Sequence, residues 1–219
     1  MARTDPDDLS ARGVTAFLVE RGMPGLSTGP AYRKMGQAGS PVSEVHMADC
    51  IVPAENVIGG REGQGFKTAM KVLNKQRIHL AALCIGPAIR MLEDAVTFVA
   101  TRKQFGQTLS SFQLIQALIA DSQTEIHAAR ALVLDTARKR DEGIDVTMEA
   151  SMCKYFASEM CGRVADRSVQ MLGGYGYIAD HGMERFYRDV RLFRLYEGTS
   201  QIHQLNIAKR TLARAGYGV

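Results

Sequence analysis

The spacing of apolar residues after position 63 restricts the fold more than any other feature of this sequence. Leu, Ile, Met, Val and Phe recur there at intervals of three and four residues, which is the repeat of an amphipathic helix. Because short loops separate the helical stretches, we expect an antiparallel four-helix bundle. Helices of about 30 residues are on the order of 45 Å long, which favours packing across subunits. The pattern predicts helices over residues 64–101, 111–141, 146–172, 182–193 and 200–214.

The first 62 residues differ from the rest of the chain. They are rich in Gly and Pro and contain two β-type runs, Val14–Val19 and Val42–Val52, of the kind that forms strands. Two strands are too few to be stable alone. We therefore interpret residues 1–62 as a partial β domain and residues 63–219 as a helical-bundle domain, and the predicted fold class is mainly α.

Composition and charge narrow the possible classes of function. The 219 residues are 46% hydrophobic and 23% charged, as in a globular rather than a disordered protein. The net charge of +4 does not require a nucleic-acid partner, and no run of 18 apolar residues suggests a membrane span. The four cysteines and five histidines lack metal-binding spacing, so no metal site is predicted. Unpaired thiols and the lack of a secretory signal favour the cytoplasm, or the mitochondrial matrix in a eukaryote.

A single carboxylate occupies a short turn before the last predicted helix. Glu197 is followed by Gly198, which frees the backbone to turn, and by Thr199 and Ser200, either of which can cap a helix. Such a turn can aim an acid–base group at a fixed point. A Glu in a turn is more often solvated, so the local pattern alone leaves both interpretations open.

Three other polar segments also have two interpretations each. The glycine loop at 170–177 is typical of a helix C-cap, although a backbone this open can also approach a phosphate. Ala179 replaces the last Gly of a GxGxxG pattern, which argues against a nicotinamide site. Arg102 is either a cation at a helix C-terminus or a phosphate ligand beside Phe105. Arg77 belongs either to a solvated helix face or to a substrate clamp.

Taken together, the motifs of this sequence resemble those of the acyl-CoA dehydrogenase family of flavoenzymes, in order and spacing over nearly the whole chain. The resemblance implies an N-terminal helical domain, a middle β domain and a C-terminal four-helix bundle, of which this sequence resembles only the latter part. We therefore expect a fragment of a longer protein. The motifs are Met35-Gly-x-x-x-Ser-Pro, Asp49-Cys-x-Val-Pro-Ala-Glu-Asn, Gly63-x-Gly-Phe-Lys, Arg102-Lys-Gln-Phe-Gly, Gln170-Met-Leu-Gly-Gly-Tyr-Gly-Tyr, Tyr187-Arg-Asp and Tyr196-Glu-Gly-Thr-Ser-Gln-Ile.

The implied reaction is the FAD-dependent α,β-dehydrogenation of an acyl-CoA thioester. A carboxylate removes the α-proton, and the β-hydrogen leaves as hydride to flavin N5. In the commonest branch of the family the base matches Glu197. Other branches place it where this chain has Gln76, which cannot act as a base.

The resemblance also assigns binding residues and partners. Arg77 and Gly198 resemble substrate contacts, although Asn74 replaces the usual Asp near Arg77. FAD is expected at a dimer interface, with Gln170 to Gly174 supplied by a partner subunit, in a homodimer or tetramer. The implied electron acceptor is electron-transferring flavoprotein. The residues that resemble flavin contacts are Arg102, Phe105, Gln113, Gln170, Gly173, Gly174, Thr199 and Gln201.

Two alternatives remain open from the sequence. The same bundle can serve as a non-catalytic assembly module with an incomplete flavin site. An acyl-CoA oxidase-like flavoprotein differs in the access of oxygen to the reduced flavin, which the sequence does not reveal.

Overall fold

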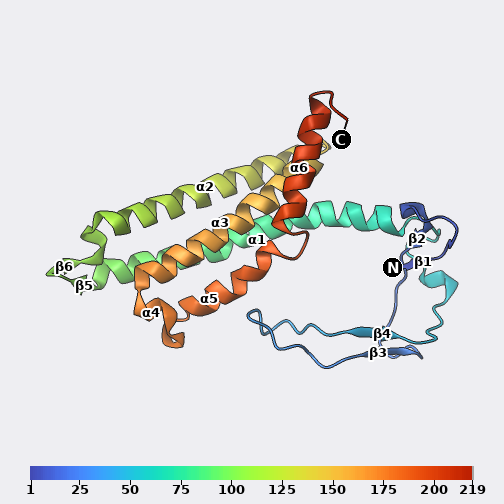
Figure 1. Cartoon of the computed structure of the whole chain (residues 1–219), viewed down its shortest axis with the longest axis horizontal. Helices are drawn as coiled ribbons and strands as arrows, with labels where there is room; N and C mark the ends of the chain where they lie inside the picture. Colours follow the sequence, from blue (N-terminus) through green and yellow to red (C-terminus); the bar gives the residue numbers. More distant parts are fainter. Residues whose placement is uncertain (219) are drawn as a thin grey trace. The chain divides into compact units, whose positions relative to one another are not determined.

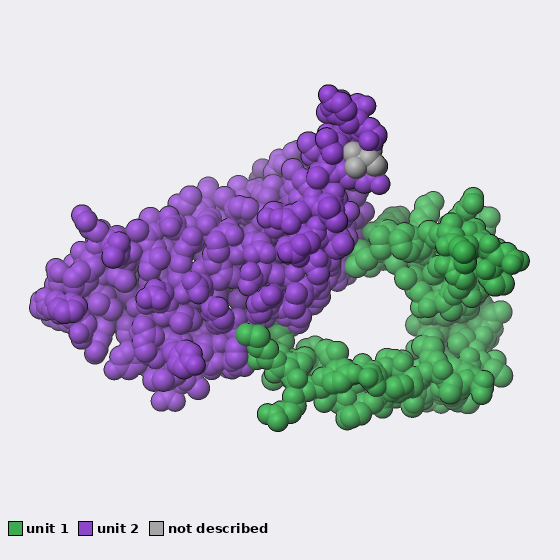
Figure 2. Space-filling view, viewed as in Figure 1, with its two compact units in different colours: residues 1–73 green, residues 74–219 purple. Residues whose placement is uncertain are grey.

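A computed structural model describes residues 1–218, and it is mainly helical (Figure 1). The chain divides into two compact units, residues 1–73 and residues 74–219 (Figure 2). Helix α1 (Gly65–Thr101) begins in the first unit and continues into the second. The predicted domain boundary at residues 62 and 63 stays a prediction.

The first unit contains four short strands in two antiparallel pairs. Strand β1 (Ala2–Arg3) pairs with β2 (Val14–Thr15), and β3 (Leu26–Thr28) pairs with β4 (Val45–Met47). Single 3₁₀ turns occur at Ala11–Gly13 and Ala54–Asn56.

The two predicted strands are both too long. After Thr15 the first run no longer pairs with β1. Its backbone forms hydrogen bonds with residues 56–58 instead, and Leu18 N lies 2.8 Å from Asn56 O. The second run pairs regularly only over β4, whose three residues are all exposed. A strand ends where the partner segment stops pairing with it. The apolar residues of one run do not show where its partner segment ends, so the sequence does not give the length of the strand.

The five predicted helices are present, with differences at their ends. The segment 182–193 is divided, because its last turns form a 3₁₀ helix at Arg191–Arg194. The glycine loop contains a single turn, α4 (Gly174–Tyr177), followed by a 3₁₀ turn at Ala179–His181. The other helices are α2 (Gln113–Asp141), α3 (Thr147–Leu172), α5 (Met183–Val190) and α6 (Ser200–Arg214). The predicted fold class, mainly α with a helical bundle, is confirmed.

A tight hairpin joins the first two long helices. Strands β5 (Lys103–Gln104) and β6 (Gln107–Thr108) pair around Phe105 and Gly106, whose φ angles are +52° and +80°. Two consecutive positive φ values match the two-residue turn that suits a twisted hairpin. A 3₁₀ turn at Leu109–Ser111 then leads into α2.

Helix α3 lies at the centre of the bundle. Met160, Cys161 and Val164 on this helix are fully buried, and they share one core with Met91 and Val99 of α1. Burying a side chain of this size contributes roughly 1.5–3 kcal/mol. Polar residues of α3 are buried as well, including Ser151, Lys154 and Ser158.

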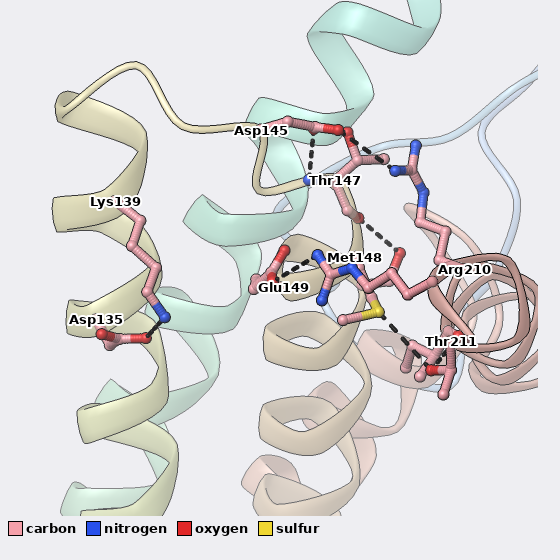
Figure 3. Close-up of polar contacts among 11 residues, drawn as sticks. Asp135, Lys139, Asp145, Thr147, Met148, Glu149, Arg210 and Thr211 are labelled. Carbon is pink, nitrogen blue, oxygen red and sulfur yellow. Dashed lines mark hydrogen bonds and ion pairs between the residues drawn. The ribbon is translucent and has the colours of Figure 1, made fainter. Parts of the chain in front are cut away.

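Helix α6 is attached to the beginning of α3 by polar contacts (Figure 3). Nη1 of Arg210 lies 3.4 Å from Asp145 Oδ2, just before α3, and Thr211 Oγ1 lies 3.8 Å from the sulfur of Met148. Because the turn that carries Glu197 leads directly into α6, these contacts also restrain the end of that turn.

Candidate active site

The turn between residues 195 and 200 has an unusual backbone. Glu197 has φ +57° and Gly198 has φ +98°, a region that residues other than Gly adopt at a cost of roughly 1–2 kcal/mol. Thr199 then caps α6, because its hydroxyl oxygen accepts a 3.4 Å hydrogen bond from Ile202 N. Of the two predicted caps, Thr199 is the one used, and Ser200 is the first residue of the helix.

Helix α3 contacts this turn through two charged side chains. Lys154 Nζ donates a 2.6 Å hydrogen bond to the carbonyl oxygen of Gly198. Five residues further along, Glu159 accepts hydrogen bonds from Ser200 Oγ at 2.5 Å and from Arg194 Nη1 at 3.2 Å. The middle and both ends of the turn are therefore bonded to a core helix.

His203 supports the turn from α6. Its side chain is fully buried, and Nε2 lies 3.2 Å from the carbonyl oxygen of Glu197. Burial, together with the nearby cations Lys154 and Arg77, lowers the pKa of His203 to about 4, so the ring is neutral at pH 7. Because its partner is a carbonyl oxygen, the proton is assigned to Nε2.

Arg77 of α1 faces the same turn. Its side chain is 8% exposed, and Nη1 donates a 2.9 Å hydrogen bond to Asn74 Oδ1. Burial lowers the pKa of Arg77, and the negative charge of Glu197 opposes this shift. The amide of Asn74 thus serves as the partner of Arg77 where the resemblance implies an Asp.

The carboxylate of Glu197 is not on the open surface. Its Oε2 atom is buried and has no hydrogen-bond partner among residues 1–218. Leaving a buried polar atom unpaired is costly, and such atoms gather at functional sites. The site therefore presents one unpaired carboxylate oxygen on a strained turn, with a buried guanidinium nearby.

A second feature is a groove of about 590 Å³ at the far end of α3. Arg102, Gln170, Gly173 and Gly174 line it together, so four of the predicted flavin contacts converge there. The guanidinium of Arg102 lies over the ring of Tyr175, 5.4 Å from its centroid. Within the described part of the chain Arg102 has no carboxylate partner at ion-pair distance.

The glycine loop beside this groove caps α3. Gly173 has φ +60°, and its N–H lies 3.0 Å from Val169 O. The helix C-cap interpretation is therefore confirmed, whereas a phosphate contact stays a prediction. A Cβ atom built at Gly173 or Gly174 would meet nothing within 4 Å, so the backbone faces open space.

The remaining predicted flavin contacts do not line the groove. Phe105 sits on the hairpin tip with 91% of its side chain exposed, and Gln113 is exposed at the start of α2. Thr199 and Gln201 lie beside Glu197. Lys154 and Glu159 both contact the turn, and Gln170 follows them on the same helix by 16 and 11 residues. The two sets are therefore roughly 16–24 Å apart along the helix axis.

Sequence reasoning misses three residues of the site, the buried Lys154 and His203 and the partly buried Glu159. The segment Ser151-Met-Cys-Lys154 matches the SxxK pattern of penicillin-type acyl enzymes, and without the companion motifs the match is interpreted as chance. His203 has no metal-binding spacing, so the sequence favours a structural or surface role for it. The available signal is periodicity, because Ser151, Lys154 and Ser158 are spaced by three and four and all face the core.

Neither a metal centre nor a membrane span is found in the described chain. Residues 1–218 contain no group of three His, Cys, Asp or Glu side chains placed to hold an ion. No helix among those residues has both the length and the apolar character needed to cross a bilayer.

Comparison with known proteins identifies the family. A family model described as "Acyl-CoA dehydrogenase, C-terminal domain" matches residues 63–212. The chain belongs to the acyl-CoA dehydrogenase family. The resemblance noted in the motifs is thereby confirmed.

Individual relatives are similar over almost the whole chain. It is 44% identical to acryloyl-CoA reductase (NADH) of Anaerotignum propionicum, covering 97% of this chain and 54% of that protein. It is 41% identical to the caffeyl-CoA reductase–Etf complex subunit CarC of Acetobacterium woodii, covering 97% and 56%. The structure of butyryl-CoA dehydrogenase from Megasphaera elsdenii has a TM-score of 0.91 and 40% identity, covering 96% of this chain and 55% of that one. The chain thus spans about half the length of the relatives it matches.

Proposed function

We propose that this chain carries the catalytic base of a flavin-dependent acyl-CoA dehydrogenase and that Glu197 is that base. The observation that supports this role is the buried, unpaired Oε2 atom of Glu197, held on a turn that α3 and α6 both contact. A base must accept a proton in a fixed direction, and an oxygen without a protein partner is free to do so.

Glu197 acts on the α-carbon of the thioester. Its carboxylate accepts the α-proton, the α-carbon–hydrogen electron pair becomes the new carbon–carbon double bond, and the β-hydrogen leaves as hydride. A bound flavin supplies the acceptor for that hydride. Arg77 is buried beside the turn and keeps a positive charge close to the carboxylate.

The groove at the end of α3 fits the anionic part of a flavin dinucleotide. Arg102 has no carboxylate partner within residues 1–218 and is free to bind phosphate, while Gly173 and Gly174 leave the backbone accessible. A cation beside an open glycine loop is a common anion site.

The distance of roughly 16–24 Å between this groove and the Glu197 turn favours two subunits sharing one flavin. One chain supplies Thr199, Gln201 and the base, and its partner supplies the groove. The relative named as a subunit of a reductase–Etf complex supports electron-transferring flavoprotein as the redox partner.

The reverse reaction is a second candidate, and the names of the relatives favour it. Two proteins that are 41% and 44% identical to this chain are reductases of unsaturated acyl-CoA thioesters. The same carboxylate, once protonated, would donate its proton to the α-carbon as hydride reaches the β-carbon. Glu197 therefore has a role in both directions, and only the driving redox partner differs.

Assays in both directions test the proposal. The purified chain, supplied with FAD, is given butyryl-CoA with an artificial electron acceptor, and separately acryloyl-CoA with a reductant. Bound flavin is measured by its absorbance in the protein fraction. Glu197→Gln is compared with Glu93→Gln, because Glu93 is exposed on α1.

We expect Glu197→Gln to abolish turnover in whichever direction is active, while flavin binding stays unchanged. Glu93→Gln should retain full turnover. Undiminished activity of Glu197→Gln would refute the assignment of the base. A chain that binds no flavin and turns over neither thioester would favour the non-catalytic assembly module.

A further inference from the structure

Lys154 is the most deeply buried charged residue in the described chain, with no exposed surface. We propose that Lys154 is a positioning residue that fixes the direction of the Glu197 carboxylate by holding the carbonyl of Gly198. Its effect on catalysis rests on the function proposed above, whereas its effect on the turn does not.

The burial of Lys154 requires an explanation in terms of its partners. A buried ammonium loses several kcal/mol of hydration, and burial lowers the pKa of Lys154. The titratable groups that interact electrostatically with it are Cys84 and Arg77 of α1, Glu159 of its own helix, Glu197 of the turn and His203 of α6. Its hydrogen bond to Gly198 O is 2.6 Å long, which is in keeping with a charge-assisted bond.

The backbone of the turn needs such a restraint. Glu197 and Gly198 both have positive φ, and strained positions persist only where the surroundings over-determine them. Glu159 bonds Arg194 and Ser200, three residues to either side of Glu197. Lys154 bonds the middle of the turn.

His203 supplies a different contact. It bonds the carbonyl of Glu197 from α6, the helix that directly follows the turn in the chain. Lys154 lies on α3, the central helix of the core. The bond from Lys154 therefore ties the carbonyl of Gly198, in the middle of the turn, to the central helix of the core.

A thiol at position 197 makes the orientation measurable without flavin or substrate. In the Glu197→Cys background, the alkylation rate at position 197 is measured by peptide-resolved mass spectrometry, with and without Lys154→Met. Ser158→Ala is the matched control, because Ser158 is also fully buried on α3 but its hydroxyl bonds Tyr155 O of the same helix, at 3.3 Å.

We expect Lys154→Met to raise the alkylation rate at position 197 by about tenfold or more, as expected for loss of a charge-assisted hydrogen bond. Lys154→Arg, which keeps the charge and the donor, should restore most of the protection. Ser158→Ala should leave the rate unchanged. The native thiols Cys84, Cys153 and Cys161 are buried and report on unfolding in the same sample.

An unchanged rate at position 197 in Lys154→Met, with the three native thiols still protected, would overturn the proposal. So would an equal rise in Ser158→Ala. If Lys154→Met exposes the native thiols, Lys154→Gln takes its place, with the same expected rise and the same refutation. If the alkylation rate at position 197 rises as expected but the chain with its native Glu197 turns over neither thioester, the proposed function is refuted and the positioning role of Lys154 stands.

Discussion

Replacing Gly198 by Ala should destabilise the protein for two separable reasons. The first is backbone strain. Gly198 has φ +98°, and a residue with a Cβ adopts such a conformation at a conformational cost of roughly 1–2 kcal/mol. The second is steric, because the new Cβ would lie 2.9 Å from His203 Nε2 and 3.3 Å from its Cε1. His203 is fully buried, so its ring cannot move away without disturbing neighbours.

The expected cost is the sum of these two contributions. Overpacking a buried site typically costs about 1–3 kcal/mol, so Gly198→Ala should lower the free energy of unfolding by about 2–5 kcal/mol. Gly182→Ala is the matched control. Gly182 has φ +69°, but a Cβ added there would meet nothing within 4 Å, so only the backbone contribution of roughly 1–2 kcal/mol applies.

Urea unfolding followed by circular dichroism measures both variants. A double-mutant cycle with His203→Ala removes the atoms that the new methyl group would meet. In that background the cost of Gly198→Ala should fall to that of Gly182→Ala. Equal costs for the two glycine variants in the native background would refute the steric contact, and with it the close packing of His203 against the turn.

Three further predictions concern stability and reactivity. Because the folded state keeps His203 neutral down to a pKa of about 4, against an ordinary 6.5, the unfolded chain binds more protons between these values. This difference contributes up to about 3 kcal/mol to the free energy of unfolding. The contribution is fully present above pH 6.5 and should be lost as the pH falls towards 4. Urea titrations at several pH values measure it, and His203→Gln should flatten the profile. Glu125 of α2 bonds Arg163 and Arg167 of α3 at 3.0–3.2 Å, so Glu125→Ala should cost about 1–3 kcal/mol in urea unfolding, and less at high salt. In the native protein, iodoacetamide should modify Cys50 well before the three buried thiols, and mass spectrometry of the modified peptides checks this order.

The helices are predictable from the sequence because their burial has a regular period. The pattern predicts a helix over residues 146–172, and α3 spans Thr147–Leu172. The strands are less predictable, because Val14–Thr15 pairs with Ala2–Arg3, two residues with no apolar pattern. A strand depends on a partner elsewhere in the chain, whereas a helix forms its hydrogen bonds within itself.

The site shows the same division between local and distant causes. The turn at Glu197 is predictable because Gly198 and Thr199 determine it locally. The burial of Lys154 is not predictable in this way, because lysine is usually exposed and its partner Gly198 lies 44 residues further along the chain. The unpaired oxygen of Glu197 depends likewise on which helices surround it.

Helix α3 makes the packing of the core and the geometry of the site depend on the same contacts. Its first half supports the Glu197 turn through Lys154 and Glu159, and its C-terminal end lines the groove at Gln170 and Gly173. An α-helix is stiff, and each residue advances it by about 1.5 Å and turns it by about 100°. Inserting one residue between positions 160 and 170 would therefore rotate the groove away from its present face while leaving the turn in place. The separation between the groove and the Glu197 turn is thus set by the core helix. The proposed function therefore predicts that substitutions that change how α3 packs affect flavin binding and proton transfer together.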